Sequence, residues 1–243
     1  MIIQRFPDED ALASALASRL LAAIIQSPRL VLGLPTGRSP LALYRVLAGR
    51  SLQERVNWSG VRTFNLDEFV GLGGADAGSY RAFMQSALFD HVGIEPGQIH
   101  LLDGRAPDLA AECGRYERAI AAASGIDIQI LGIGANGHVG FNEPADALRA
   151  QTHIATLTLG TRAANAHWFG NDPDRVPAHA LSMGMATILA AREIILIATG
   201  AEKAAAVSGM VNGLITPRLP ASFLQLHTRV TVMVDNAAWG QKS

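Results

Sequence analysis

A glycine-rich loop with one histidine is the part of the sequence best suited to chemistry. It spans residues 132–144, contains four glycines and follows a short apolar segment. Glycine permits positive φ and lets a ligand approach the backbone closely. His138 can take up or release a proton near neutral pH, and Glu143 can orient its ring and stabilise the charged form. The loop predicts an acid–base relay; the alternative is a core histidine bonded to a backbone carbonyl. 

Two adjacent acids, Asp67 and Glu68, end a predicted buried strand at residues 61–66. Acids at such a place conflict with core packing unless they face a cleft, so a functional role is favoured over a capping or surface role. Side chains alternate along an extended chain, which sends the two carboxylates to opposite faces. We expect one of them to reach a substrate, and the sequence leaves open which.

The segment PTGRSP at residues 35–40 follows another apolar run and has the features of an anion-binding turn. Ser39 stands where a helix N-cap belongs and Pro40 at the first helical position, which leaves backbone N–H groups free at the helix start. Such an end attracts an anion. The groups that could bind a phosphate here are the hydroxyls of Thr36 and Ser39, the backbone at Gly37 and the charge of Arg38. The alternative is an ordinary capped turn.

Other reactive side chains carry less information on their own. Lys203 lies near the start of a predicted helix, where it could meet the same anion, although a lone lysine is more often solvated. His138 has no second histidine three or four residues away, so the sequence predicts no metal site. Cys113 falls in a predicted amphipathic helix without a nearby histidine, and we do not expect it to act as a nucleophile.

Alternating strands and helices must position these residues. The predicted strands lie at 29–34, 61–66, 126–134, 193–200 and 229–235, and the predicted helices include 8–26, 79–92 and 107–123. This alternation predicts an α/β fold, a Rossmann-like, mostly parallel sheet with helices on both faces. Ligands of such folds bind outside the carboxyl ends of the strands, which is where the loops above begin.

We expect a single domain over residues 1–243, with a small helical lid at 159–191, where polar residues and the Asn171-Asp172-Pro173 turn interrupt the alternation. With 49% hydrophobic residues the chain can build a core shielded on both faces. A net charge of −1 argues against nucleic acid as a partner, and no apolar run approaches the length of a membrane span. A single cysteine and the absence of a leader pattern predict a cytoplasmic protein.

Six stretches of the sequence closely resemble glucosamine-6-phosphate deaminases, in order and over nearly the whole chain. They are LGLPTGRSP, FNLDEFVGL, SYRAFMQSALFDHV, GIGANGHVGFNEP, TGAEKAAAV and PASFLQLH. The 6-phosphogluconolactonases share the fold, a phosphate loop and a similar histidine loop. The continuation Phe141-Asn142-Glu143-Pro144 resembles the deaminases and is the most specific discriminator.

The resemblance implies conversion of glucosamine 6-phosphate to fructose 6-phosphate and ammonia, without an organic cofactor. It assigns ring opening to His138 with Glu143 and Asn136, and proton transfer between C2 and C1 to Asp67. It assigns the phosphate to residues 36–39 with Lys203 and His167. The alternatives are the same reaction on galactosamine 6-phosphate and, less favoured, a 6-phosphogluconolactonase. The partner is then a small amino sugar phosphate, bound by a monomer or small homo-oligomer.

The chain departs from the family pattern at several positions. Asn136 stands where many members have aspartate, so we expect the relay to depend more on Glu143. His167 stands where many members place a phosphate-binding arginine. We hypothesise that Arg38, at a position where the family usually has a small residue, binds the phosphate in place of that arginine. Because the sequence ends soon after Val234 and has His153 and Ala155 where allosteric members carry basic residues, we do not expect allosteric activation.

Overall fold

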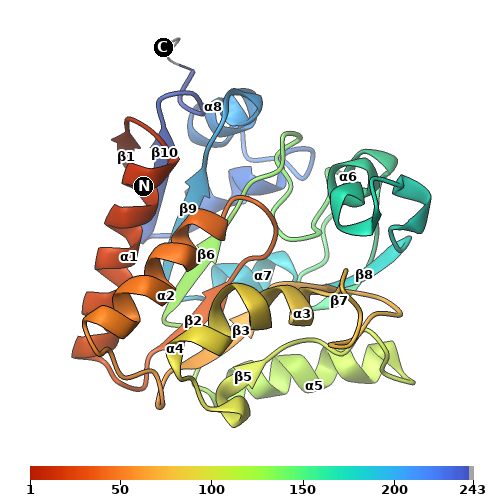
Figure 1. Ribbon diagram of the computed structural model, residues 1–243. Coiled ribbons are helices and arrows are strands. Elements are labelled where there is room, and N and C mark those ends of the chain that lie inside the picture. Colours follow the sequence, from red (N-terminus) through yellow and green to blue (C-terminus); the bar gives the residue numbers. More distant parts are fainter. Residues whose placement is uncertain (241–243) are drawn as a thin grey trace.

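A seven-stranded sheet runs through the middle of the computed structural model, which describes residues 1–240 (Figure 1). Its order is β1-β10-β9-β6-β2-β3-β5, and every neighbouring pair is parallel. The strands are β1 (Ile2–Phe6), β2 (Val31–Leu34), β3 (Arg62–Asn65), β5 (Ile99–His100), β6 (Ile128–Leu131), β9 (Glu193–Ala198) and β10 (Val230–Asp235). The predicted α/β fold with a parallel sheet is confirmed.

Helices cover both faces of this sheet because its central strands are apolar on both sides. In β9, Ile195 and Ile197 pack with α1 (Glu9–Gln26) and α2 (Leu41–Gln53). Ile194 and Leu196, which alternate with them, pack on the opposite face. The helices of that face are α5 (Leu109–Ala122), α7 (Met185–Leu189) and α8 (Ala204–Asn212). Within residues 1–240, no helix is both long and apolar enough to cross a membrane.

Side-chain caps fix where three of the helices begin. The carboxylates of Asp8 and Asp108 accept hydrogen bonds from backbone N–H groups in the first turns of α1 and α5. Ser79 does the same for α3 (Tyr80–Met84). That helix continues through a π-helical turn (Gln85–Phe89) into α4 (Asp90–Val92), so the predicted helix at 79–92 is found with one irregular turn inside it.

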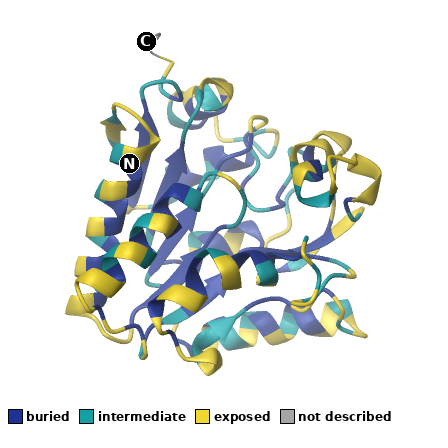
Figure 2. Ribbon diagram, viewed as in Figure 1, coloured by how far each residue is buried: buried dark blue, intermediate teal, exposed yellow. Residues whose placement is uncertain are grey.

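A second, three-stranded antiparallel sheet lies beside the first one and was not predicted. It pairs β4 (Asp67–Phe69) with β8 (His179–Ser182), and β8 with β7 (His153–Thr156). Residues 157–178 leave this sheet between β7 and β8, and we call them the α6 segment. They contain α6 (Leu159–Asn165) and short 3-10 turns at Ala166–Phe169 and Pro173–Arg175. Figure 2 shows much of their surface exposed.

The order of strands places a crevice between β2 and β6. From β2 the chain moves to β3 on one side, whereas from β6 it moves to β9 on the other. The loops that follow the two strands therefore diverge and leave space at their carboxyl ends. Those loops are residues 35–40 and 132–144, the two that carry the predicted phosphate and histidine sites.

Candidate active site

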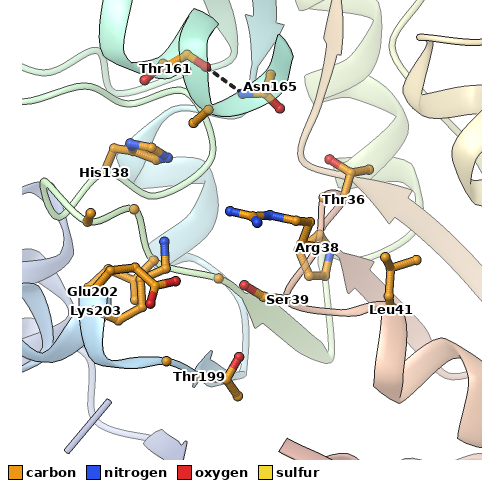
Figure 3. Close-up of a pocket in the computed structure, with 18 of the residues that line it drawn as sticks. Thr36, Arg38, Ser39, Leu41, His138, Thr161, Asn165, Thr199, Glu202 and Lys203 are labelled. Atoms are coloured by element: carbon orange, nitrogen blue, oxygen red, sulfur yellow. Dashed lines mark hydrogen bonds between the residues drawn. The ribbon is translucent and has the colours of Figure 1, made fainter. Parts of the chain in front are cut away.

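One cavity of about 940 Å³ occupies the crevice between the β2 and β6 loops. Every predicted site residue except Glu143 lines it. Figure 3 shows the Arg38 side chain extending from the wall formed by Thr36 and Ser39 toward the wall that holds His138 and Lys203. The fold therefore gathers side chains that are far apart in the sequence around one space.

The β2 loop and Lys203 make one end of this cavity cationic. Gly37 has a φ of 91°, a conformation that favours glycine. Burial lowers the pKa of Lys203, the nearby Glu202 carboxylate raises it, and the positive charge of Arg38 lowers it again. Arg38 and Lys203 line the same cavity, so both positive charges face the space that an anion would occupy.

The predicted N-cap at Ser39 was wrong. Helix α2 begins at Leu41, and Pro40 occupies the cap position without a side-chain hydrogen bond to the helix. The Pro40 carbonyl accepts the first helical bond from Tyr44 at 2.9 Å, while a turn from Arg38 to Leu41 precedes it. Ser39 therefore lies one residue too early to cap, and its hydroxyl remains available at the cavity wall.

Strand β4 separates the two adjacent acids. Asp67 faces the cavity and accepts a hydrogen bond from the Thr36 hydroxyl at 3.2 Å. Glu68 points away, is 1% exposed, and accepts backbone hydrogen bonds from Phe69, Tyr80 and Arg81 at 2.8–3.0 Å. The choice that the sequence left open is thus made by the pleat of β4: Asp67 reaches the cavity, and Glu68 caps α3.

The environment of Asp67 gives it the pKa of a base that works near neutrality. Burial raises its pKa to about 7, the Thr36 hydrogen bond opposes that rise, and the charge of Glu68 adds to it. A carboxylate with such a pKa binds a proton more readily than one in water and still loses it at neutral pH. Asp67 is therefore suited to carry a proton from one atom to another.

The β6 loop holds His138 in one orientation. The Nδ1 atom of His138 lies 2.8 Å from Oδ1 of Asn136, whose Nδ2 donates to Oε2 of Glu143 at 3.0 Å. Gly134 makes room for the ring, since a Cβ there would lie 2.3 Å from two imidazole atoms. Burial lowers the pKa of His138, the Glu143 carboxylate raises it, and Lys203 lowers it. The neutral ring is therefore the form favoured at neutral pH.

The expected direct contact between Glu143 and His138 is replaced by a chain through Asn136. The Glu143 carboxylate is 3.8 Å from Nδ1 of His138, whereas the Asn136 oxygen is within hydrogen-bonding distance. An uncharged amide thus occupies the position between the ring and the acid. Glu143 does not line the cavity, and it acts on the His138 ring through its hydrogen bond to Asn136.

Comparison with known proteins agrees with these features. A family model described as glucosamine-6-phosphate isomerases/6-phosphogluconolactonase matches residues 7–233. The chain belongs to this glucosamine-6-phosphate isomerase/6-phosphogluconolactonase family. The glucosamine-6-phosphate deaminase of Beutenbergia cavernae is 45% identical over 232 residues, which are 96% of this chain and 89% of the relative. That of Halothermothrix orenii is 46% identical over 223 residues, 91% of this chain and 92% of the relative.

Solved structures of the family give the same picture. A monomeric glucosamine-6-phosphate deaminase superposes over 100% of both chains with a TM-score of 0.96 at 39% identity. A 6-phosphogluconolactonase from Thermotoga maritima covers 96% of this chain and 98% of its own, with a TM-score of 0.73 at 20% identity. The second likeness concerns the fold alone. The resemblance noted in the sequence is confirmed at the level of the family.

Several cavity residues of this family member were missed from the sequence. They are Arg45, Tyr80, Thr161, Asn165 and Asp235, together with Glu9 and Asp10 at the start of α1. Arg45 follows Leu41 by four residues on α2, so helical spacing from the β2 loop would have found it. Thr161 and Asn165 share a face of α6 at the same spacing; the sequence predicted a lid at 159–191 but did not indicate which face of its helix turns to the cavity.

The remaining predicted positions have mixed surroundings. His167 lines the cavity from the α6 segment, where its Nδ1 lies 2.9 Å from the Ala164 carbonyl and its ring packs on Trp168. Cys113 is buried in the core, where burial raises its pKa. Among residues 1–240, the histidine, cysteine and acidic side chains form no group of three or more that could hold a metal ion.

Proposed function

We propose that this chain isomerises and deaminates glucosamine 6-phosphate, giving fructose 6-phosphate and ammonia. One observation carries the proposal. Asp67, with a pKa raised to about 7 by burial, and the imidazole of His138 line the same cavity as the cations Arg38 and Lys203. Isomerisation of a phosphorylated aldose needs a proton carrier beside the sugar carbons and positive charge at the phosphate. The deaminase relatives at 45–46% identity support the same activity.

The phosphate would bind at the cationic end. Lys203 and Arg38 supply the charge, and residues 36–39 supply hydroxyl and backbone donors. His167 lines the same cavity from the α6 segment and offers a ring nitrogen to the phosphate. This placement sends the sugar carbons toward Asp67 and His138.

Ring opening would be the task of His138. The Nδ1–H group donates a hydrogen bond to Oδ1 of Asn136, so Nε2 carries the lone pair. Nε2 takes the proton of the C1 hydroxyl, the bond between C1 and the ring oxygen breaks, and the ring oxygen receives a proton from the imidazolium. The product is the open-chain aldehyde, and His138 returns to its neutral form.

Asp67 would then move a proton between two carbons. Its carboxylate removes the proton from C2 while the aldehyde oxygen takes a proton from solvent, which gives an enolamine. The carboxylic acid so formed returns its proton to C1, and a protonated imine is left at C2. Water adds to C2 and passes a proton to the nitrogen, which leaves as ammonia; loss of the remaining hydroxyl proton to solvent gives the ketone of fructose 6-phosphate. Each positioned acid–base step contributes about 10²–10⁴-fold to the rate.

The first prediction tests the activity itself. We expect ammonia release from glucosamine 6-phosphate in one-to-one proportion with ketose phosphate, measured by coupled assays for both products. Galactosamine 6-phosphate, which differs at C4, should react with a lower kcat/KM. A higher value for galactosamine 6-phosphate would reassign the substrate, and absence of ammonia from both epimers would remove the proposal.

The second prediction concerns Arg38. We expect Arg38→Ala to raise KM about 10-fold or more while changing kcat by less than about threefold, because a charged hydrogen bond to phosphate contributes roughly 1.5–3 kcal/mol to binding. Arg45→Ala, at the same wall of the cavity, is the matched control and should have the smaller effect. An unchanged KM in Arg38→Ala would show that Arg38 does not bind the phosphate.

We also propose that the α6 segment is the mobile part of the expected lid. Its polar surface is exposed, whereas β8 and α7, which complete residues 159–191, are built into the second sheet and the core. The ionised phosphate of the substrate supports a cytoplasmic site of action, since such an ion does not cross a membrane unaided. A monomer or a small homo-oligomer remains the expected state.

A further inference from the structure

We propose that Thr161 is a positioning residue of the acid–base relay: its hydroxyl holds the Glu143 carboxylate, which sets Asn136 and thereby the ring of His138. This inference rests on the proposed function, because it assigns the relay a catalytic use. The residues come from two separate parts of the chain, the β6 loop and α6. They meet at the wall of the cavity.

The hydrogen bonds between α6 and the imidazole converge on the Glu143 carboxylate from both sides. The Thr161 hydroxyl donates to Oε1 of Glu143, and Nδ2 of Asn136 donates to Oε2 at 3.0 Å. The Asn136 oxygen then accepts from Nδ1 of His138 at 2.8 Å and from its backbone N–H at 3.2 Å. The backbone contact fixes which end of the amide faces the ring. The chain of bonds therefore keeps the proton on Nδ1 and leaves Nε2 as the base.

Thr161 is needed because the Glu143 carboxylate has an alternative hydrogen-bond partner, the imidazole of His138. Oε2 of Glu143 is only 3.8 Å from Nδ1 of His138, and a charged acceptor is a stronger partner for that N–H than an amide oxygen. A small movement of Glu143 would displace Asn136 and bind the ring directly. Thr161, which is 4% exposed, holds the other oxygen and keeps the carboxylate back. Thr158 lies at 3.4 Å from the same oxygen but also caps α6.

Helix α6 is itself attached to the opposite wall of the cavity. Nδ2 of Asn165 donates to the Thr161 carbonyl at 2.9 Å, the dashed contact in Figure 3. The Tyr80 hydroxyl donates to the Asn165 side-chain oxygen at 3.2 Å, and Glu68 holds the backbone of Tyr80. In the arrangement that the structure shows, Tyr80 thus holds α6 from the Asp67 side of the cavity. Thr161 thereby links the position of α6 to the state of the His138 ring.

Thr161→Val tests this link because valine keeps the shape and loses only the hydroxyl. We expect kcat for ammonia release to fall about 10–100-fold, a part of the 10²–10⁴-fold that an acid–base group supplies. KM should stay within about twofold, since Thr161 is not among the groups assigned to the phosphate. Thr161→Ser, which restores the hydroxyl, should recover kcat to within about threefold.

A second readout separates positioning from simple support of the fold. Imidazole nitrogen chemical shifts, measured by NMR with substrate absent, should show the proton of neutral His138 on Nδ1 in the wild type. In Thr161→Val the released Glu143 carboxylate should bind Nδ1–H directly, so the imidazole spectrum should change and the ring should titrate at a higher pH than in the wild type. Thr187→Val is the matched control: its hydroxyl donates to Glu117 at 2.6 Å, in a buried site away from the cavity. That variant should keep both kcat and the wild-type imidazole spectrum.

The outcomes are distinct. A wild-type kcat in Thr161→Val, or a lowered kcat with an unchanged imidazole spectrum, would overturn the positioning role. If the wild type releases no ammonia from either epimer, the proposed function fails. The imidazole spectra still decide the inference in that case: an unchanged spectrum and titration in Thr161→Val overturn it, and a ring that titrates at a higher pH supports it.

Discussion

Replacement of His138 by glutamine is expected to lower kcat for ammonia release by about 10²–10⁴-fold. Glutamine keeps a polar group at the cavity wall but cannot accept a proton from the C1 hydroxyl and return it to the ring oxygen. The residues assigned to the substrate phosphate lie on other loops, so KM should change by less than about threefold. Steady-state assays with glucosamine 6-phosphate measure both values.

The His138→Gln result needs a check that the loop survives. Asn136 and Glu143 are still present in the variant, so the thermal unfolding midpoint should lie within a few degrees of the wild type. An open-chain analogue with a C1 aldehyde that cannot cyclise should lose much less rate, because it needs no ring opening. Wild-type kcat on the cyclic sugar would remove His138 from the mechanism.

Asp67→Asn is expected to reduce kcat by at least as much, because every turnover needs a proton moved from C2 to C1. The amide has nearly the same shape and can still bond the Thr36 hydroxyl. Its stability should equal or exceed that of the wild type, since an ionised carboxylate at this buried site carries a desolvation cost. Retained exchange of the C2 proton with solvent in the variant would contradict the assignment.

The pH dependence of the wild type gives an independent view of Asp67. Its pKa is raised to about 7 by burial, and the proposed base is the ionised form. The value of kcat/KM should therefore be low below pH 6 and rise as pH increases through about 7. The substrate phosphate also ionises, with a second pKa of about 6 for a phosphate monoester. That value lies below the step expected for Asp67, so the two ionisations can be told apart. A single acidic limb near 4, the range of an ordinary carboxylate, would show that Asp67 is not the titrating group.

The parts of the fold that the sequence predicts are those with apolar runs on both sheet faces. Strands β2, β6, β9 and β10 were found because buried residues follow one another without interruption. Strand β1 was missed because it is an edge strand, exposed or half-buried along its length, with Ile2 62% exposed. Its pairing with β10 depends on residues far along the chain.

The site was predictable where chemistry follows a strand and hidden where two distant elements meet. Asp67 comes directly after an apolar run, and His138 lies in the glycine-rich loop that follows another, which marked them. The choice between Asp67 and Glu68 needed the β4 pairing, and the insertion of Asn136 between His138 and Glu143 needed the actual turn of the loop. The contact of Thr161 with Glu143 joins two segments by tertiary packing, for which the sequence carries no local signal.

The α6 segment begins and ends on paired strands, since Thr156 of β7 lies opposite His179 of β8. The ends of this excursion are already held together by the sheet, so changing its length alters the closure entropy only slightly, by about 0.6 kcal/mol per doubling. The α6 segment can therefore be lengthened, shortened or exchanged during evolution while Asp67, on strand β4 next to β8, keeps its position. Substrate preference can diverge in this architecture without rebuilding the groups beneath.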